Sequence, residues 1–232
     1  AEMNWGNAPG QWGAIHFHED DIADCGWETD FSFELPPVLR SGVYGIKISV
    51  DDYWDIMPIF LCPPKGKSTA RVCLVISTFT YVVYTNQARA DFGQHWRDRA
   101  AAWGSFPYNP VDYPDYGLST YNDHEDGSGI CMATWHRPIL NLRPGYHPFA
   151  DDSSVSGLRH FPADTHILAW LENKGIDFDV VTDWELHHEG SSVLESYKAV
   201  LTSSHPEYHT LGSLNAFSDY RNNGGNLVYL GG

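Results

Sequence analysis

The strongest constraint on the fold is the alternation, from residue 66 onward, of short apolar runs with helix-forming stretches. Four runs have the composition of strands: "ARVCLVIS", "DFDVVT", "YKAVLTS" and "NLVYLGG". Two intervening stretches, "PADTHILAWLENKG" and "TLGSLNAFSDYRNNGG", have the apolar spacing of helices, and a Thr-x-x-Glu capping box at Thr182 and Glu185 marks a further helix start. Strands that alternate with helices and are apolar on both faces indicate a parallel sheet with right-handed crossovers. We therefore predict an α/β fold, a parallel sheet with flanking helices, over residues 66–232.

Residues 1–65 have a different pattern, which predicts β structure. In "SGVYGIKISVDDYWDIMPIFLCPP", loosely alternating apolar residues, a turn at "DDYWD" and a second apolar run that ends at a double proline indicate a hairpin. We interpret it as the final hairpin of a β-sandwich domain. The short stretch "PPKGKST" has the composition of a linker, which places a domain boundary near residue 65.

A long insertion at residues 91–160 interrupts the α/β pattern. It is rich in Tyr, Trp, His, Gly and Pro and weak in periodicity, and it contains "YPDYGLSTYNDHEDGSG" and "HRPILNLRPGYHP". A connection of this length inside a compact domain usually serves a function. We expect it to fold over an edge of the sheet.

Charge and cysteine content narrow the class of protein. With 30 acidic against 14 basic residues the net charge is -16, which disfavours nucleic acid and anionic membrane surfaces as partners. No apolar run is long enough to span a bilayer, and the first residues lack the pattern of a signal peptide. The four cysteines are far apart, so we expect isolated buried thiols in a reducing cytoplasm: Cys25, Cys62, Cys73 and Cys131. The start without Met and the end at "LVYLGG" predict a chain that is truncated at its C-terminus.

Ligands of open parallel sheets bind outside the carboxyl ends of the strands. "STFTYVVYTN" follows the first strand and "SSHPEYHT" follows the third. The side chains expected to converge there, with contributions from the insertion, are Tyr81, Tyr84, His205, Glu207 and Tyr121 or His124. A tyrosinate is a hard ligand that suits iron(III) better than zinc, so a Tyr-rich site with one Glu would bind iron. The competing interpretation is that the tyrosines are amphipathic core residues and that Glu207 is an ordinary carboxylate at a helix start.

Two other strings resemble metal sites. "HFHEDD" places His16 and His18 on one face of a strand, but it lies in the β part, away from the predicted sheet edge, and we expect a surface role. "HEDGSG" has the acidic and Gly content of a calcium loop without its spacing, so we predict a tight turn.

The remaining polar motifs favour structural roles. Arg137 and Arg143 are expected to be partners of carboxylates, and His187 and His188 are expected to face solvent. The sequence contains no Gly-x-Ser-x-Gly elbow and no phosphate loop, which disfavours serine hydrolase and nucleotide-dependent chemistry. A nitrilase-like cysteine hydrolase is also disfavoured, because none of the cysteines follows a strand in an elbow-like turn.

Several blocks, in order, resemble the large (beta) subunit of N,N-dimethylformamidase: "TFTYVVYTN", "DYGLSTYNDHEDGSG", "RPILNLRPGY", "FPADTHILAWLENKGIDFDVVTD" and "LTSSHPEYHT", with "NGGNLVYLGG" at the end. The likeness runs from about residue 35 to the end. It implies a class I glutamine amidotransferase-like, flavodoxin-like domain preceded by β-sandwich domains. It also implies an amidohydrolase whose mononuclear iron, Fe³⁺, is held by two Tyr and one Glu.

Matched residue by residue, the resemblance implies Glu207 as the carboxylate ligand and Tyr121 as the Tyr supplied by the insertion. The other tyrosinate is Tyr84, with Tyr81 as the alternative. His205 matches a residue that holds the attacking water or the substrate oxygen. The family also uses an Asn just after "YLGG" and a Glu much further on, and neither is present in this sequence, which leaves the activity of this piece alone open.

The implied reaction is hydrolysis of a small tertiary amide, such as N,N-dimethylformamide, to formate and dimethylamine. Trp103, Phe106 and Tyr116 could supply a small apolar pocket for the methyl groups. The resemblance also implies a small partner subunit, and the Trp-rich β part predicts a homo-oligomer. The alternative function belongs to another class: a glutamine amidotransferase-like binding or assembly module that kept the scaffold without the chemistry.

Overall fold

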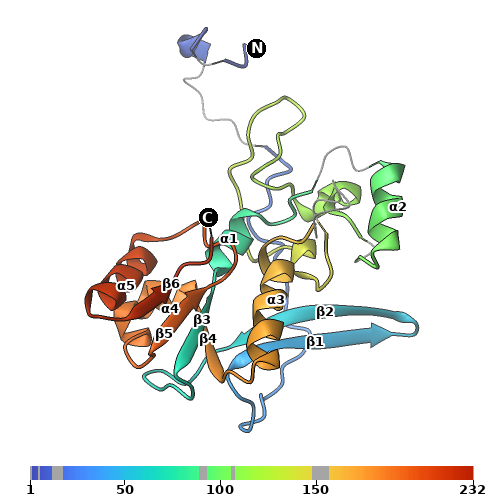
Figure 1. Cartoon of the computed structure of the whole chain (residues 1–232). Helices are drawn as coiled ribbons and strands as arrows, with labels where there is room; N and C mark the ends of the chain where they lie inside the picture. Colours follow the sequence, from blue (N-terminus) through green and yellow to red (C-terminus); the bar gives the residue numbers. More distant parts are fainter. Residues whose placement is uncertain are drawn as a thin grey trace.

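The structure is a computed structural model of the 232-residue chain. It describes residues 2–4, 6–11, 18–88, 93–105, 108–147 and 157–231. Four parallel strands form its sheet: β3 (Val72–Ile76), β4 (Phe178–Thr182), β5 (Ala199–Thr202) and β6 (Asn226–Val228). The predicted α/β class with a parallel sheet is thereby confirmed (Figure 1).

The order of the strands in the sheet is β4-β3-β5-β6. The chain therefore passes from β3 to β4 on one side and then returns to β5 on the other side. A crevice at such a reversal of strand order is the usual ligand site of open α/β sheets. The order equals the first four strands of the flavodoxin-like arrangement, while the class I glutamine amidotransferase assignment stays an implication of the resemblance.

Alternate residues of β3 supply two separate hydrophobic cores. Cys73 and Val75 join one cluster, whereas Leu74 and Ile76 join the other, and all four are almost fully buried. Successive side chains of a strand point to opposite faces, so a strand covered on both faces must be apolar at every position. This is the physical reason for the continuous apolar run that identifies β3 in the sequence.

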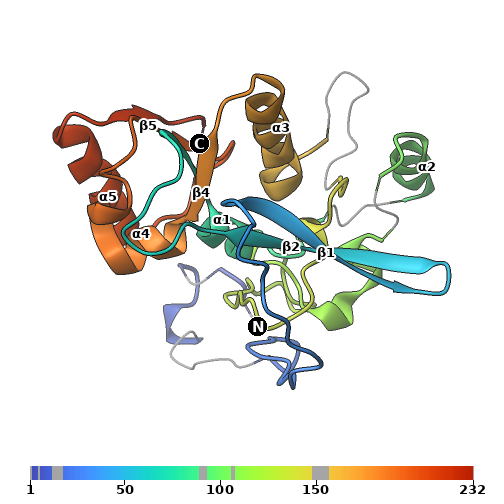
Figure 2. The ribbon, with the colours of Figure 1, turned by 90° about the horizontal axis from the view of Figure 1, so that it is seen from below.

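Helices α4 (Asp183–Glu189) and α5 (Leu211–Asn222) cover the first face. The capping box at Thr182 and Glu185 is present as predicted, and it ends β4 and begins α4 without a connecting loop. The other face carries α3 (His160–Asn173), part of the insertion and the N-terminal hairpin (Figure 2).

The predicted hairpin consists of β1 (Gly42–Val50) and β2 (Tyr53–Leu61), paired antiparallel around a two-residue turn. It packs on the sheet, because Val43 and Phe60 contact the second core and the Ser41 hydroxyl bonds both to the carbonyl and to the amide of Val180. Among residues 18–88 and the rest of the described chain, no other strand joins this hairpin. The preceding β-sandwich therefore stays an expectation, as does the domain boundary near residue 65.

The insertion contains one α-helix and several short 3-10 helices within its described parts, and further short helices lie elsewhere. They are α2 (Gln94–Ala102), η2 (Pro110–Asp112), η3 (Pro114–Tyr116), η4 (Leu140–Leu142), η1 (Pro9–Gln11) and η5 (Gly190–Val193). In the described portion of the chain, none of the helices has the length and apolarity needed to cross a bilayer.

Two expectations about single residues need correction. Only Cys73 is buried, whereas Cys62 is half-buried and Cys25 and Cys131 are exposed, because the last two lie in irregular segments outside the sheet. Arg143 pairs with a carboxylate as predicted, with 2.6 Å between Nη2 and Asp55 Oδ2. The Arg137 guanidinium instead donates to the carbonyl of Leu118 at 3.0 Å, and no described carboxylate forms an ion pair with it.

Candidate metal centre

The candidate site lies where the strand order reverses, at the carboxyl ends of β3 and β5. Helix α1 (Thr78–Val83) follows β3 directly, and Tyr84 is its C-cap residue. The turn "SSHPEYHT" follows β5 and leads into α5. The sheet therefore brings the two motifs together, as the rule for ligand sites predicts.

The hydroxyl of Thr80 ties the turn to α1. It accepts hydrogen bonds from the backbone N–H of Glu207 at 3.1 Å and of Tyr208 at 3.0 Å, and Thr80 is fully buried. A buried hydroxyl that accepts two backbone donors fixes the register of the turn on the helix. Pro206, also buried, restricts the turn further, since its ring fixes φ and disfavours the helical conformation at His205.

The Glu207 side chain connects the turn to the end of α1. The Tyr84 hydroxyl donates to Glu207 Oε2 at 2.5 Å, and His205 Nε2 lies 3.0 Å from the same oxygen. Two of the predicted residues, Tyr84 and His205, thus contact the same carboxylate oxygen of Glu207.

Tyr121 completes the predicted group from the insertion. Its ring stacks on Tyr84 with the ring centroids 4.3 Å apart and the planes inclined by 10°. The Thr120 hydroxyl donates to the carbonyl of Val83 at 2.7 Å, which anchors this turn to the end of α1. The Tyr121 hydroxyl lies 2.5 Å from that of Tyr208. Tyr121 is 44% exposed, so the insertion covers one side of the site and leaves it accessible to solvent.

The phenols of this group hold their protons at neutral pH. Burial, and then the hydrogen bond to Glu207, raise the pKa of Tyr84 to about 12. Burial likewise raises the pKa of Tyr121 to about 12, and the contact with Tyr121 followed by burial raises that of Tyr208 to about 12. Only a strongly acidic cation would convert such phenols to ligands.

Tyr81 points away from this group. It is 1% exposed and its hydroxyl donates to Asp164, whose other oxygen accepts from the backbone N–H of Ser204 at 2.6 Å. Its ring packs in the core with Phe161, at a centroid distance of 6.2 Å. Of the two alternatives, Tyr84 is the tyrosine that contacts Glu207.

His160 is part of the site although no sequence pattern marks it. Its ring centroid lies 4.1 Å from that of Tyr84 and 5.5 Å from that of His205. It is 4% exposed, its Nε2 has no hydrogen-bond partner in the described structure, and burial lowers its pKa to about 3, so the ring is neutral. The backbone takes the left-handed conformation, φ 52°, which is rare for residues other than glycine and recurs at functional sites.

Other predicted residues lie elsewhere. Tyr116 lines a cavity of about 550 Å³ against the hairpin, together with Ile48 and Trp54. Trp103 lies beside His147, with the ring centroids 5.5 Å apart. Phe106 and His16 lie outside the described residues. His187 and His188 are exposed, as predicted. His124 lies three residues after Tyr121, in contact with Asp20 rather than with Tyr84.

The predicted ligands that converge here are two phenols, Tyr84 and Tyr121, and one carboxylate, all of them hard oxygen donors; Tyr208 adds a third phenol beside Tyr121. Such a set suits a small, highly charged cation better than zinc, which prefers nitrogen and sulfur. Tyr84, Tyr121 and Glu207 therefore fit iron(III), while His205 is placed to orient the carboxylate.

All of the chain, residues 1–232, matches the family described as "N,N-dimethylformamidase beta subunit-like, C-terminal". Two similar proteins are the N,N-dimethylformamidase beta subunits of Paracoccus aminophilus and of an Alcaligenes species, each 40% identical over 241 and 239 residues respectively. Each match covers 99% of this chain and 30% of the relative, so the chain spans less than a third of the length of these relatives.

Proposed function

The chain belongs to the N,N-dimethylformamidase beta subunit-like, C-terminal family, and from this premise we propose that it carries the iron centre of an amidohydrolase. The substrate is a small tertiary amide such as N,N-dimethylformamide, and the products are formate and dimethylamine. The observation that carries the proposal is the convergence of Tyr84, Tyr121 and Glu207 from three separate segments at one sheet edge.

Tyr84, Tyr121 and Glu207 would hold the metal. Iron(III) bound there would supply Lewis acidity, toward the amide carbonyl and toward a water molecule. The hydrogen bond between Tyr84 and Glu207 supports this assignment, because it holds a phenol oxygen beside a carboxylate oxygen, and a cation that displaces the phenol proton would bind both.

His205 is the proposed acid–base or water-positioning group. Its Nε2 bonds to Glu207 Oε2 at 3.0 Å, and its side chain is 25% exposed, so the ring lies beside the ligand and within reach of solvent. The buried neutral ring of His160 packs on Tyr84 at an inclination of 31°, and it would keep water from that side of the site. Exclusion of water strengthens each polar contact at the site.

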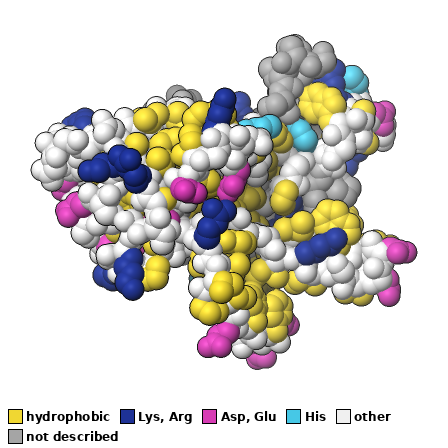
Figure 3. Space-filling view, turned by 60° about the horizontal axis from the view of Figure 1, so that its bottom comes forward, with side chains coloured by type: hydrophobic (Ala, Val, Ile, Leu, Met, Phe, Trp, Pro, Cys, Tyr) yellow, Lys and Arg dark blue, Asp and Glu magenta, His cyan; other side chains and the backbone are white. Residues whose placement is uncertain are grey.

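We also propose that the protein works as an assembly, with a small partner subunit and with copies of itself. The relatives are named as subunits. Hydrophobic side chains form patches on the face drawn in Figure 3, and the tip of the hairpin exposes Val50, Tyr53 and Trp54 by 67%, 75% and 56%. Sedimentation of the full-length protein as a monomer, with and without the partner, would contradict this part.

Metal analysis of the full-length enzyme tests the function. We expect about one iron per chain and a visible phenolate-to-iron band, which Tyr121→Phe should bleach. Glu207→Ala should remove both iron and amide hydrolysis, whereas the exposed Glu195→Ala is the matched control and should change neither.

The rival function, a binding or assembly module without chemistry, requires no iron. A colourless wild-type protein with zinc or no metal would therefore support the module. Retention of iron and rate by Glu207→Ala would show that this carboxylate is an ordinary helix-start residue.

A further inference from the structure

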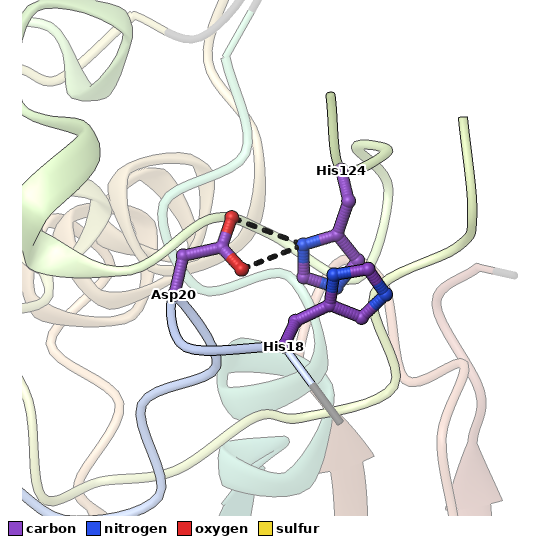
Figure 4. A group of neighbouring side chains, drawn as sticks. All are labelled: His18, Asp20 and His124. Carbon is purple, nitrogen blue, oxygen red and sulfur yellow. Dashed lines mark hydrogen bonds and ion pairs between the residues drawn. The ribbon is translucent and has the colours of Figure 1, made fainter. Parts of the chain in front are cut away.

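Two sequence strings that the iron site leaves unused meet in space. His18 and Asp20 come from "HFHEDD", and His124 comes from "HEDGSG" in the insertion (Figure 4). Each of the three offers one ligand atom, and these atoms all lie within 4.8 Å of one another. The rings of His18 and His124 stack with centroids 3.6 Å apart and planes inclined by 8°.

Both ring nitrogens of His124 lie close to carboxylates. Its Nδ1 lies 3.0 Å from Asp20 Oδ2, and its Nε2 faces Asp21 Oδ1 at 3.4 Å. A neutral imidazole has one N–H and one lone pair, so its two nitrogens cannot both donate to these carboxylates. The His124 side chain is 3% exposed, and Asp21 Oδ1 is buried without a hydrogen-bond partner in the described structure.

The turn that carries His124 is already rigid. The His124 N–H donates to the carbonyl of Ser128 at 2.8 Å, and the Gly127 N–H donates back to the carbonyl of His124 at 2.8 Å. The Ser128 hydroxyl lies 2.9 Å from His18 Nε2 and donates to Asp126 at 2.6 Å. The predicted tight turn is therefore confirmed, and it holds the two imidazoles against each other.

We propose that His18, Asp20 and His124 form a second metal site, which takes Zn²⁺ or a similar divalent transition cation. Two imidazoles and a carboxylate are typical ligands of zinc. His124 would bind through Nδ1, next to Asp20, while Nε2–H points to Asp21 in the carboxylate–histidine arrangement that orients metal-bound imidazoles. The cation would lie between the Nδ1 lone pair of His124 and the carboxylate of Asp20.

Binding requires side chains to turn, because the lone pairs of two stacked, nearly parallel imidazole rings do not point at one ion. Ligand atoms about 2.0–2.2 Å from a tetrahedral ion lie about 3.4 Å apart. The Asp20 to His124 distance of 3.0 Å is near this value, and the widest separation in the group, at most 4.8 Å, must close by about 1.4 Å or less. Rotation of the exposed Asp20 and of the half-buried His18 side chain provides that movement.

The site would link the N-terminal segment to the insertion three residues after Tyr121. Its role would be structural, because it fastens the turn that supplies Tyr121 to a second part of the chain. The proposal does not rest on the iron site, since none of its ligands is Tyr84, Tyr121 or Glu207.

Equilibrium dialysis of the full-length protein against Zn²⁺ tests the proposal, in wild type and in Glu207→Ala. We expect about one zinc per chain in both. His18→Ala and His124→Gln should each weaken zinc binding at least tenfold, and the exposed His188→Ala is the matched control that should bind as wild type does. Co²⁺ should give a ligand-field band that His18→Ala removes.

His124→Gln could disrupt the buried turn, and a loss of zinc binding would then have two explanations. His18→Ala should leave the fold intact, because His18 is half-buried and lies outside any described strand or helix, so this variant still tests the site. Unchanged zinc binding in folded His18→Ala, or no zinc binding in wild type, would overturn the proposal. The cluster would then be a polar contact group without metal, in which His124 lies between Asp20 and Asp21.

Discussion

Replacing Tyr81 and Tyr84 in turn by phenylalanine should separate metal binding from stability. Tyr81 lies on α1 and Tyr84 is its C-cap residue, yet their hydroxyls have different partners: Glu207 for Tyr84 and Asp164 for Tyr81. Tyr84→Phe removes a proposed ligand and should abolish the iron band. Its effect on stability should be small, because Glu207 is 38% exposed and keeps its contact with His205.

Tyr81→Phe should lower the stability of the protein and leave iron binding unchanged. Asp164 is 0% exposed, and after the substitution it keeps the N–H of Ser204 but loses its phenolic donor. Loss of a hydrogen bond to a buried carboxylate costs about 1.5–3 kcal/mol. In a domain of this size each kcal/mol shifts the melting temperature by about 2–4 °C, so Tyr81→Phe should lower Tm by about 3–12 °C. The iron content should not change.

The assay combines thermal unfolding of the metal-free proteins, followed by circular dichroism, with iron content and the visible spectrum of the loaded proteins. Each variant serves as the control for the other, since both lose one phenolic oxygen from the same helix. The assignment is refuted if Tyr81→Phe loses iron while Tyr84→Phe remains coloured.

Three further outcomes are expected. His205→Ala should keep the iron, because Tyr84, Tyr121 and Glu207 remain, but should lower amide turnover by about two to four powers of ten, and an unchanged rate would exclude a role in catalysis. Burial raises the pKa of Asp183 from 3.8 to about 7, so the folded state holds this proton more tightly than the unfolded chain does. The stability that this proton contributes is complete below about pH 4 and is lost as the pH rises through about 7. Urea unfolding of Asp183→Asn should therefore show a flatter dependence of stability on pH between these values. Asn86→Ala should lower Tm and weaken iron binding, because the Asn86 amide donates to carbonyls of the insertion and accepts from the N–H of Leu140. The exposed Asn222→Ala is the control and should change neither Tm nor iron binding.

The strands and the capping box could be predicted because local sequence determines them. β3 is buried on both faces, so its pattern contains no polar interruption, and Thr182 and Glu185 satisfy each other's backbone groups within three residues. Helix α1 was not predicted, since "TFTYVV" is rich in residues that favour strands. Its first turn is stabilised by Asp183, whose carboxylate accepts the Phe79 N–H at 3.0 Å from more than a hundred residues away.

The site was predictable to the extent that sheet topology determines it. The rule for parallel sheets brings Tyr84 and Glu207 together without knowledge of any side-chain contact. His160 could not be found in this way, because its contact with Tyr84 depends on a left-handed backbone conformation that follows no periodicity. The meeting of His18 with His124 was missed for a similar reason: it depends on the path of an irregular insertion.

The long sequence separation within the site has a consequence for the order of events in the cell. The contact between Tyr84 and Glu207 spans 123 residues, and a ribosome adds about 5–20 residues per second, so about 6–25 s separate the synthesis of the two side chains. During that interval the nascent chain contains Tyr84, and later Tyr121, without the carboxylate and without β5, which positions it. A hard cation would meet only protonated phenols. Iron uptake should therefore follow the completion of the sheet, and a chain arrested before β5 should emerge without metal even in iron-rich medium.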